Sequence, residues 1–416
     1  MILDLPPDLR SKVLDLTDAE SRSQLRLVSH AVKHAIDSRT RALVWRGDGK
    51  MDPRDVRRAA AAAGSVLSIK ARGHRDGRQA VSAPVVKALA AVRFTQLRWI
   101  DLGGHRARAG SLDATMQHFA RGNWPMLAAL DLSGCGITGR GGAFLALAAW
   151  PRLRVLNVSD NRLGPRGASW ITWPLKTLML DGCGLGDEGV AALAAALATA
   201  PLLRLHLSRN EIGEAGARTL SRTGWKLQRL DLSVNALGPA GVAALAGAPW
   251  PLRDFAADYM FLGTDIVTWP ALRTLTAHNA LAFDPAAPAP SADVSALETL
   301  DLSFNSPPAT RRVLFSREWP RLKALSLKNL DDETVMELFL GDTVFPALES
   351  LDLRCRSRSE LALGTWMVLL EDSSRRFPRL RTCRGTSRYP QVRAQLVPRF
   401  NSYRSRHTRF HWEDLV

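Results

Sequence analysis

Three glycines carry the spacing closest to that of a chemical site. Gly184, Gly186 and Gly189 form a G-x-G-x-x-G pattern after a predicted strand and at a predicted helix start, an arrangement in which backbone N–H groups bind a dinucleotide phosphate. Gly186 and Gly189 recur at equivalent places in neighbouring segments, whereas the place of Gly184 is taken there by Arg162, Glu211 and Ala236. The pattern therefore predicts a structural role within a repeated segment and no phosphate-binding site.

Two pairs of histidines, His30 with His34 and His407 with His411, have the i, i+4 spacing that places two imidazoles on one helix face. Neither pair has a glutamate next to its first histidine or an evident third ligand, so both pairs are predicted to be surface residues. The chain also lacks a G-x-S-x-G elbow, a P-loop and a cysteine-nucleophile motif. We therefore predict no catalytic residue, no metal and no cofactor, and a protein that is not an enzyme.

The composition indicates a protein without membrane segments. Hydrophobic residues make up 46% of the 416 residues, yet no uninterrupted apolar run reaches the roughly 18 residues of a membrane span. The first residues lack the basic stretch and apolar run of a secretory signal, which favours the cytoplasm or the nucleus. The few cysteines lie far apart, which predicts reduced thiols: Cys135, Cys183, Cys355 and Cys383.

A repeated pattern, L-x-x-L-x-L-x-x-N, fills most of the chain with a mean step of roughly 26 residues. Full copies begin at Leu153, Leu202, Leu227 and Leu297 and end at Asn161, Asn210, Asn235 and Asn305. Two further copies, beginning at Leu127 and Leu175, have Cys135 and Cys183 in the asparagine place. Weaker copies begin near Val66, Leu97, Leu252, Leu272, Leu322, Leu348 and Leu380.

Each residue type in the pattern has a physical task. The alternating leucines give a short strand one apolar face, which only the matching strands of neighbouring repeats can bury. Asparagine carries donors and an acceptor, so it can satisfy backbone groups where the chain turns away from the strand. Cys135 and Cys183 lie two repeats apart, too far to form a disulfide, and are expected to be free thiols in the asparagine place.

A predicted helix follows several of the strands. Glycines mark its start after Leu163, Ile212 and Leu237, and Val190, Leu193 and Leu197 have helical spacing. In the same helix, Asp187 and Glu188 lie at the start, where the helix dipole favours negative charge. The stretch from Phe283 to Asp293, rich in alanine and proline, predicts an irregular loop in place of one helix.

One strand and one helix in each repeat predict an α/β solenoid. Residues 60 to 385 resemble the ribonuclease-inhibitor type of leucine-rich repeat, most strongly from Leu127 to Ala246. The resemblance implies a horseshoe with parallel strands on the inside and helices on the outside.

Most repeats open with an aromatic residue and a proline. The proline ends the preceding helix and the ring can fill the outer layer, so core packing is the favoured interpretation and a tryptophan-rich ligand site the alternative. The aromatic residues are Trp124, Trp150, Trp173, Trp250, Trp269, Trp319, Phe345 and Phe377.

A short helical head precedes the repeats. The segments around Leu5 to Leu9, Val13 and Leu14, and Leu25 to Ile36 predict three short helices, with a capping signal from Thr17 to Glu20. The head resembles an F-box, which implies docking onto a Skp-type adaptor that leads to a cullin-RING ubiquitin ligase. The resemblance assigns the bundle or its docking surface to Leu5, Pro6, Leu9, Val13, Leu14, Leu25, Leu27 and Val28. The alternative is a cap that shields the first repeat from water.

The sequence thus predicts an F-box-like head at 1–45, a solenoid at 46–385 and a basic, aromatic tail at 386–416. We predict a substrate-recognition subunit of a Skp-cullin-F-box ligase. The alternatives are a cytoskeletal or signalling scaffold and a Ran-type GTPase activator, the latter with Arg140 or Arg166 as the catalytic arginine. That family's acidic tail is absent here.

The binding surface is predicted from the residue between the second and third leucines, which points into the curve. The inner face has an acidic tendency, and a target with a basic segment is the favoured ligand. A local basic island interrupts this face at Arg204, His206, Arg209 and Arg229. The residues assigned to the face are Asp101, Asp131, Asn157, Met179, Arg204, His206, Arg209, Arg229, Asp231, Asp254, Asp301 and Asp352.

The C-terminal end of the chain, including the tail, carries much of the net charge of +16, since residues 375 to 416 hold eleven arginines against Glu413 and Asp414. Its arginines alternate with aromatic residues such as Tyr389, Phe400 and Trp412. Two interpretations stay open: binding of nucleic acid or an acidic surface, and a disordered solubilising tail.

Overall fold

The computed structural model describes part of the chain, and the structural features given below belong to that part. The described residues are 42–45, 53–54, 56, 66–71, 83–104, 113–263, 266, 268–287, 292–328, 330–354, 377–385 and 409–412. They fall into two compact units, one ending at Asn161 and one beginning at Arg162, which are described separately.

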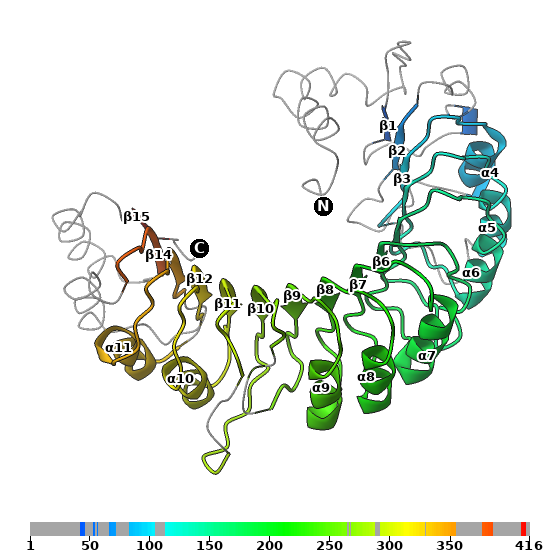
Figure 1. Cartoon of the computed structure of the whole chain (residues 1–416). Helices are drawn as coiled ribbons and strands as arrows, with labels where there is room; N and C mark the ends of the chain where they lie inside the picture. Colours follow the sequence, from blue (N-terminus) through cyan, green and yellow to red (C-terminus); the bar gives the residue numbers. More distant parts are fainter. Residues whose placement is uncertain are drawn as a thin grey trace. The chain divides into compact units, whose positions relative to one another are not determined.

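Unit 1 is a parallel sheet with helices on one side. Its strands pair in chain order: β1 (Ala42–Trp45), β2 (Ser68–Ala71), β3 (Trp99–Asp101), β4 (Ala129–Asp131) and β5 (Val155–Asn157). Its described helices are α4 (Ala83–Ala91), α5 (Asp113–Phe119) and α6 (Gly139–Leu145). The helices stack side by side along the unit (Figure 1).

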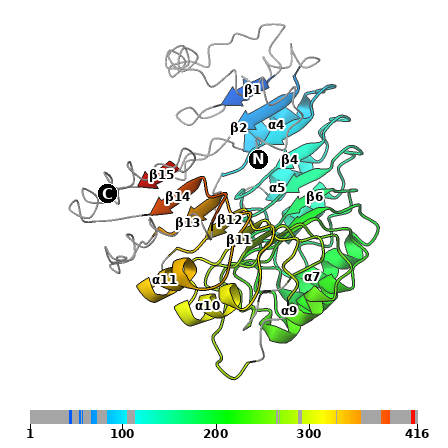
Figure 2. The same cartoon turned by 60° about the vertical axis from the view of Figure 1, so that its left-hand side comes forward.

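Unit 2 repeats the same plan, with its strands on one side and its helices on the other (Figures 1 and 2). Its first strands are β6 (Thr177–Met179), β7 (Arg204–His206), β8 (Arg229–Asp231), β9 (Asp254–Ala256) and β10 (Thr274–Thr276). They continue with β11 (Thr299–Asp301), β12 (Ala324–Ser326), β13 (Ser350–Asp352), β14 (Thr382–Gly385) and β15 (Arg409–Trp412). Its described helices are α7 (Gly186–Ala196), α8 (Glu214–Ser221), α9 (Gly238–Ala246), α10 (Pro307–Phe315) and α11 (Asp332–Leu340).

The leucine pattern folds as the sequence predicts. In each strand the middle residue is paired with its equivalent in the next strand, as Leu178 is with Leu205 and Leu205 with Leu230. These leucines are fully buried, because each one is covered by its equivalents on both sides. The weaker copies are also strands, including those that begin near Val66 and Leu380. The predicted leucine-rich-repeat solenoid is therefore confirmed.

The buried asparagines tie each turn to its neighbour. Asn235 donates from Nδ2 to the carbonyl of Leu207 at 2.9 Å and to that of Leu232 at 2.8 Å, while its Oδ1 accepts from the amide of Ile212 at 3.0 Å. Cys135 and Cys183 occupy the same place as free, buried thiols, as predicted. Cys135 Sγ lies 3.2 Å from the carbonyl oxygen of Leu102 in the preceding repeat.

The aromatic residues of the Trp-Pro and Phe-Pro motifs form a buried outer layer. All eight are at most 7% exposed. Trp124 and Trp150 stack at a centroid distance of 5.7 Å, and Phe119 contacts both rings edge-on. The indole Nε1 of Trp225 donates to the carbonyl of Leu197 at 2.8 Å. The core-packing interpretation is confirmed.

The helix predictions are confirmed after Ile212 and Leu237, where α8 and α9 begin, and at Val190 in α7. Asp187 lies in the first turn of α7, and its Oδ1 also accepts from the amides of Gly213 at 2.7 Å and Gly216 at 2.9 Å in the next repeat. One acidic side chain therefore stabilises the start of two neighbouring helices.

The helix predicted after Leu163 is wrong. Residues 165 to 170 form a run of turns, in a connection of only residues 158 to 176 between β5 and β6. Within this segment the rings of Trp170 and Trp173 pack edge-on, with centroids 5.9 Å apart. The short connection explains the missing helix better than Pro165 does, because α9 begins with the same Leu-Gly-Pro-x-Gly pattern. The loop predicted from Phe283 is confirmed for the described residues, which contain no helix between β10 and β11.

Two strands extend beyond the predicted solenoid boundaries. β1 falls at the end of the predicted head, and β15 falls within the predicted tail. The domain boundaries themselves stay a prediction.

The asparagine contacts predict a measurable loss of stability in unit 1. Asn161 donates to the carbonyls of Leu132 and Val158 and accepts from the amide of Ile137, all within 2.9 Å. Asn161→Ala leaves these buried groups without partners, and we expect unfolding free energy to fall by about 2 to 3 kcal/mol. Urea unfolding measures the change.

Asn123→Ala is the matched control, because Asn123 is exposed in the same unit. It should change the unfolding free energy by less than about 0.5 kcal/mol. Equal effects of the two substitutions would contradict the role given to the asparagine.

Candidate binding face of the repeats

The strand register groups the residues predicted for the inner face. In unit 1 Asp101 is paired with Asp131 and Asp131 with Asn157. In unit 2 the equivalent residues also pair from strand to strand and form one column, which we call the inner column. Its members are Met179, His206, Asp231, Ala256, Thr276, Asp301, Ser326, Asp352 and Arg384.

The two aspartates of the predicted face in unit 1, Asp101 and Asp131, accept hydrogen bonds from the loops that follow their strands. Both are buried, Asp101 fully and Asp131 to 7% exposure. Asp131 Oδ1 accepts from the amide and the hydroxyl of Ser133, at 2.9 and 2.7 Å, and its Oδ2 accepts from Asn157 Nδ2 at 3.1 Å. These carboxylates are therefore already engaged by contacts within the fold. The part of the predicted face that a ligand can reach lies in unit 2.

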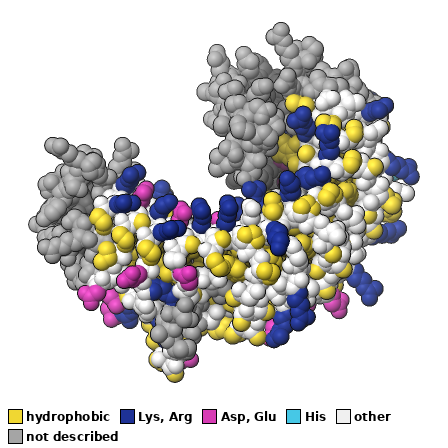
Figure 3. Space-filling model, in the orientation of Figure 1, with side chains coloured by type: hydrophobic (Ala, Val, Ile, Leu, Met, Phe, Trp, Pro, Cys, Tyr) yellow, Lys and Arg dark blue, Asp and Glu magenta, His cyan; other side chains and the backbone are white. Residues whose placement is uncertain are grey.

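A row of basic side chains lies near the start of the first strands in unit 2. Arg204 in β7 is paired with Arg229 in β8, which is paired with Asp254 in β9. Arg204 and Arg229 are exposed, as are three further basic residues in neighbouring repeats: Lys176, Arg253 and Arg273. Lys and Arg side chains project from the strand side in Figure 3. Two residues of the predicted basic island, Arg204 and Arg229, are thus part of a longer row, whereas His206 and Arg209 lie further along the chain.

Asp181, His206 and Asp231 form a group whose ligand atoms lie within 4.8 Å of one another. Two carboxylates and an imidazole can bind a divalent cation such as zinc or manganese. His206 Nδ1 lies 3.9 Å from Asp231 Oδ2, and burial raises the pKa of Asp181. Because Arg204 and Arg229 lie two residues before His206 and Asp231 on the same strand face, their charge opposes a cation there.

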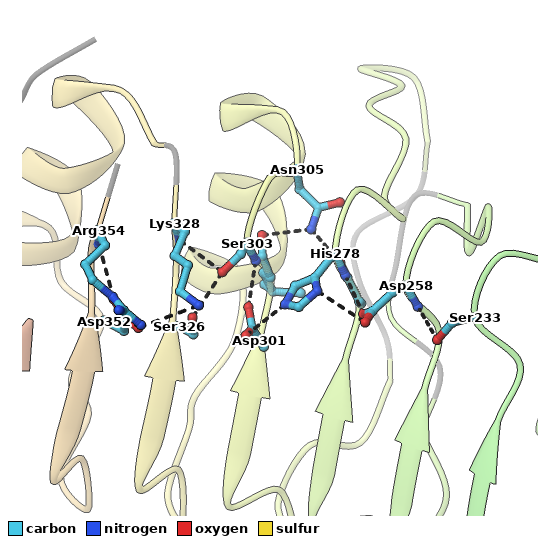
Figure 4. A network of polar contacts seen from close by, with 12 residues as sticks. Ser233, Asp258, His278, Asp301, Ser303, Asn305, Ser326, Lys328, Asp352 and Arg354 are labelled. Carbon is cyan, nitrogen blue, oxygen red and sulfur yellow. Dashed lines mark hydrogen bonds and ion pairs between the residues drawn. The ribbon is translucent and has the colours of Figure 1, made fainter. Parts of the chain in front are cut away.

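In a second group with the same residue types, the histidine itself occupies the space between the two carboxylates. His278 lies between two carboxylates, with Nδ1 at 3.2 Å from Asp258 Oδ2 and Nε2 at 2.8 Å from Asp301 Oδ2 (Figure 4). Hydrogen bonds to Asp258 and then Asp301 raise the pKa of His278 to about 9 against the opposing effect of burial. The imidazole is therefore protonated at neutral pH, and the three residues, here called the His278 triad, carry one net negative charge.

Polar contacts continue from the His278 triad along the column. Asp301 Oδ1 accepts from the amide of Ser303 at 3.0 Å, and the hydroxyls of Ser303 and Ser326 lie 3.0 Å apart. Arg354 binds Asp352 through two nitrogens, Nε to Oδ1 at 2.9 Å and Nη2 to Oδ2 at 2.7 Å. Lys328 Nζ lies 3.8 Å from the same carboxylate, so this second cluster carries one net positive charge (Figure 4).

The residue just before the asparagine place has a left-handed backbone in six successive repeats of unit 2. We call these residues the left-handed row. They are Gly182, Arg209, Val234, Tyr259, Asn279 and Phe304, with φ between 46° and 64°. Several members project apolar groups into solvent: Val234 is 45% exposed and Tyr259 is 58% exposed, beside Phe261 at 51%.

This conformation is unfavourable for side chains such as those of valine and phenylalanine. The left-handed region costs an L residue roughly 1 to 2 kcal/mol, whereas glycine adopts it freely. The greater freedom of glycine in the unfolded chain offsets about 0.5 to 1 kcal/mol of that difference. Glycine occupies the place in Gly134 and Gly182, so the turn itself requires no side chain.

The G-x-G-x-x-G glycines serve the repeat, as predicted. Gly184 and Gly186 have φ of 65° and 58°, and the amide of Gly186 donates to the carbonyl of Asn210 at 2.9 Å. A Cβ at Gly189 would lie 2.7 Å from Leu185 Cβ, so this glycine permits close packing.

The predicted adaptor-binding residues, from Leu5 to Val28, lie outside the described residues, as do the first histidine pair and most of the tail. No described helix is long and apolar enough to cross a membrane.

Comparison with known families places both parts of the chain. The model of the F-box domain matches residues 2–42. The leucine-rich-repeat model matches residues 125–146, 152–171, 174–194, 200–221 and 226–246. A ribonuclease inhibitor from Sus scrofa is 38% identical over 103 residues, which is 22% of this chain and 23% of that protein.

The chain combines an F-box domain with ribonuclease-inhibitor-like leucine-rich repeats. The aligned part spans about a quarter of the length of the curated relative. Both the F-box and the repeats are protein-interaction domains.

Two solved structures match this chain with low TM-scores. The crystal structure of the Rad7 and Elc1 complex in yeast matches with a TM-score of 0.38 and 14% identity, over 84% of this chain and 93% of that chain. An internalin from Listeria monocytogenes matches with a TM-score of 0.40 and 13% identity, over 85% of this chain and 84% of that chain.

Sequence analysis of this F-box protein missed the His278 triad. His278 and Asp258 follow the third apolar residue of their repeats, two places beyond the residues that the inner-column rule selects. The strand register brings Asp258, His278 and Asp301 together from three successive repeats. The acidic tendency at Asp301 was visible, but the compensating histidine was not among the predicted face residues.

The His278 triad predicts a pH-dependent stability. The ordinary pKa of histidine is 6.5, so between pH 6.5 and about 9 the folded protein keeps a proton that the unfolded chain has lost. The stabilisation is complete below pH 6.5 and disappears as pH rises through 9, on the order of 2 to 3 kcal/mol. Urea unfolding at pH 6 and pH 9 measures this difference.

His278→Gln removes the titrating group and keeps a hydrogen-bond donor. The variant should be less stable at pH 6 and should lose the part of the pH 6 to 9 difference that comes from His278. An unchanged difference in the variant would show that the triad does not hold the proton.

Proposed function

We propose that this chain is the substrate-recognition subunit of a Skp-cullin-F-box ubiquitin ligase. The F-box docks onto a Skp-type adaptor, and the strand face of the repeats binds the target protein. The observation that carries the proposal is the presence, in one chain, of an F-box match at residues 2–42 and a repeat sheet that begins directly after it with β1.

The strand face of unit 2 is the part that suits a target. Many of its side chains are exposed or half-buried: the basic row lies near the starts of the strands, and the inner column contains Asp231, Asp301 and Asp352. Such a surface selects a partner by electrostatic complementarity. The chain supplies recognition in this proposal, and the ligase components supply the transfer chemistry.

A scaffold whose head only caps the repeats is the competing function. The competing interpretation predicts the same strand face but no adaptor. Binding of the adaptor therefore separates the two functions.

The test uses point variants in the full chain. Leu5→Ala with Pro6→Ala should abolish co-purification of a Skp-type adaptor and a cullin, because these residues are assigned to the docking surface by the F-box resemblance. Asp4→Asn is the control and should retain both. Immunoprecipitation followed by mass spectrometry measures the partners.

Absence of the adaptor and the cullin from the wild-type sample would overturn the ligase proposal. A deletion that supports the point variants should end at Arg41, because the longer removal of residues 1–45 would also strip β1 from the sheet edge. This choice keeps loss of the head separate from damage to the repeats.

The basic tail remains a separate hypothesis. Deleting the tail from Arg384 would remove part of β14 and all of β15, so neutralising substitutions are the better test. Arg388→Gln, Arg393→Gln and Arg399→Gln together should reduce the slope of log affinity against log salt by about 2 to 3 for single-stranded nucleic acid. Filter binding at several salt concentrations measures it; an unchanged slope favours the solubilising tail.

A further inference from the structure

We propose that the ends of strands β8 to β11 anchor an apolar target segment that carries a lysine or arginine. The anchor combines the apolar part of the left-handed row with the His278 triad. It consists of Val234, Tyr259, Phe304, Asp258, His278 and Asp301. The inference rests on the proposed function, since it names the chemistry that the target presents to the strand face.

The apolar part of the anchor comes from neighbouring repeats. Val234 and Tyr259 follow adjacent strands, which lie about 4.8 Å apart, and both are around half exposed. Phe261 is 51% exposed two residues after Tyr259. The other large exposed apolar residues of the described chain, Leu147, Phe283 and Val344, lie in separate connections. Grouped exposed aromatic and aliphatic residues are typical of the centre of a protein interface.

The backbone provides independent evidence that these side chains have a use. Val234, Tyr259 and Phe304 are held in the left-handed region, where glycine is easier to accommodate. Gly182 occupies the same place in unit 2 and leaves the turn intact. Phe304 is half-buried, and its ring packs edge-on against that of His278 with centroids 6.2 Å apart, so this residue also serves the fold. Val234 and Tyr259 are around half exposed, and contact with a partner accounts for bulky residues at these two strained places.

The charge beside the apolar row selects a basic ligand. The His278 triad has two carboxylates and one imidazolium, and the side chains of Asp258 and Asp301 are 25% and 18% exposed. The oxygens that face the histidine keep lone pairs that a ligand cation can use. Tyr259 adds a ring face that attracts a cation.

The basic row lies too far away to cancel this preference. Arg229 and Arg253 lie near the start of their strands, five and six residues before Val234 and Tyr259. An extended chain covers on the order of 15 Å over that length, more than the Debye length of about 8 Å at physiological salt.

At the strand ends themselves, Arg209 lies two repeats before Asp258, which is about 10 Å at 4.8 Å per repeat. Lys328, one repeat beyond Asp301, lies 3.8 Å from Asp352 Oδ2, which offsets part of its charge. A cation beside Tyr259 therefore meets the carboxylates of the triad first.

The experiment selects ligands from a random library of twelve-residue peptides displayed on phage, with purified full-length chain as bait and no ligase component present. Enriched peptides should carry lysine or arginine beside leucine, valine or aromatic residues. One enriched peptide is then synthesised, together with a version in which the basic residue is replaced by glutamate. Fluorescence anisotropy measures both affinities, and the glutamate version should bind at least roughly tenfold more weakly.

The protein variant is Val234→Gly with Tyr259→Gly and Phe304→Gly. We expect a thermal midpoint near that of the wild type, because relief of the left-handed positions offsets the loss of the ring contact between Phe304 and His278, and peptide binding weaker by at least roughly tenfold. Phe283→Gly removes an equally exposed ring elsewhere and should leave binding unchanged.

Enrichment of acidic peptides, no enrichment at all, or unchanged binding by the triple variant would each overturn the inference. A triple variant that unfolds would also count against it, because the strain argument requires that the fold tolerate glycine. The selection contains no adaptor or cullin, so its outcome is independent of whether the F-box joins a ligase.

Discussion

The stacking of one buried leucine upon the next is the constraint on which the rest of this molecule depends. Each strand is only three residues long in most repeats, too short to be stable alone, and its middle residue is buried by the equivalent residues of its neighbours. This stacking fixes the register to the residue. Because the leucine side chain points into the core, the residues before and after it in the strand must point to the opposite face of the sheet. The columns of residues on that face therefore follow from the stacking of the leucines, without further contacts.

The asparagines extend this constraint from strands to turns. Asn210 and Asn235 are linked directly, because the amide of Asn210 donates to Asn235 Oδ1 at 3.1 Å. The side-chain amide of each buried asparagine thus donates to carbonyls of its own repeat and of the repeat before it. These carbonyls lie at the turns, beyond the paired residues of the strands. The left-handed residue immediately before the asparagine is a consequence of this turn, since the chain must reverse its direction to bring the amide inward. Functional side chains at that place are therefore held by the same bonds that hold the core.

The sequence predicted the strands, the inner column and the aromatic layer because each depends on residue type at fixed spacing. Leu205 and Trp250, for example, could be predicted to be buried from their residue type and their place in the repeat. The turn after Leu163 shows the limit: its Leu-Gly-Pro-x-Gly pattern is the one that begins α9, but the connection to the next strand is shorter and holds no helix. Likewise, nothing in the identity of Val234 or Phe304 indicates a positive φ, which is imposed by the neighbouring asparagine turn.

The two aspartate–histidine groups show how the same residue types acquire different properties from their place in the repeat. His278 follows the third apolar residue of its repeat and lies between carboxylates on both neighbouring strands, within 3.2 Å of each. His206 lies in the inner column itself, 3.9 Å from Asp231 and two residues after Arg204. A histidine held between two carboxylates keeps its proton across neutral pH, so the charge of the group stays constant, which is what a charge-selective anchor requires. The triad can therefore present a fixed negative charge beside apolar side chains, while the basic row presents the opposite sign at the other end of the same strands, and a target must satisfy both to lie across the face.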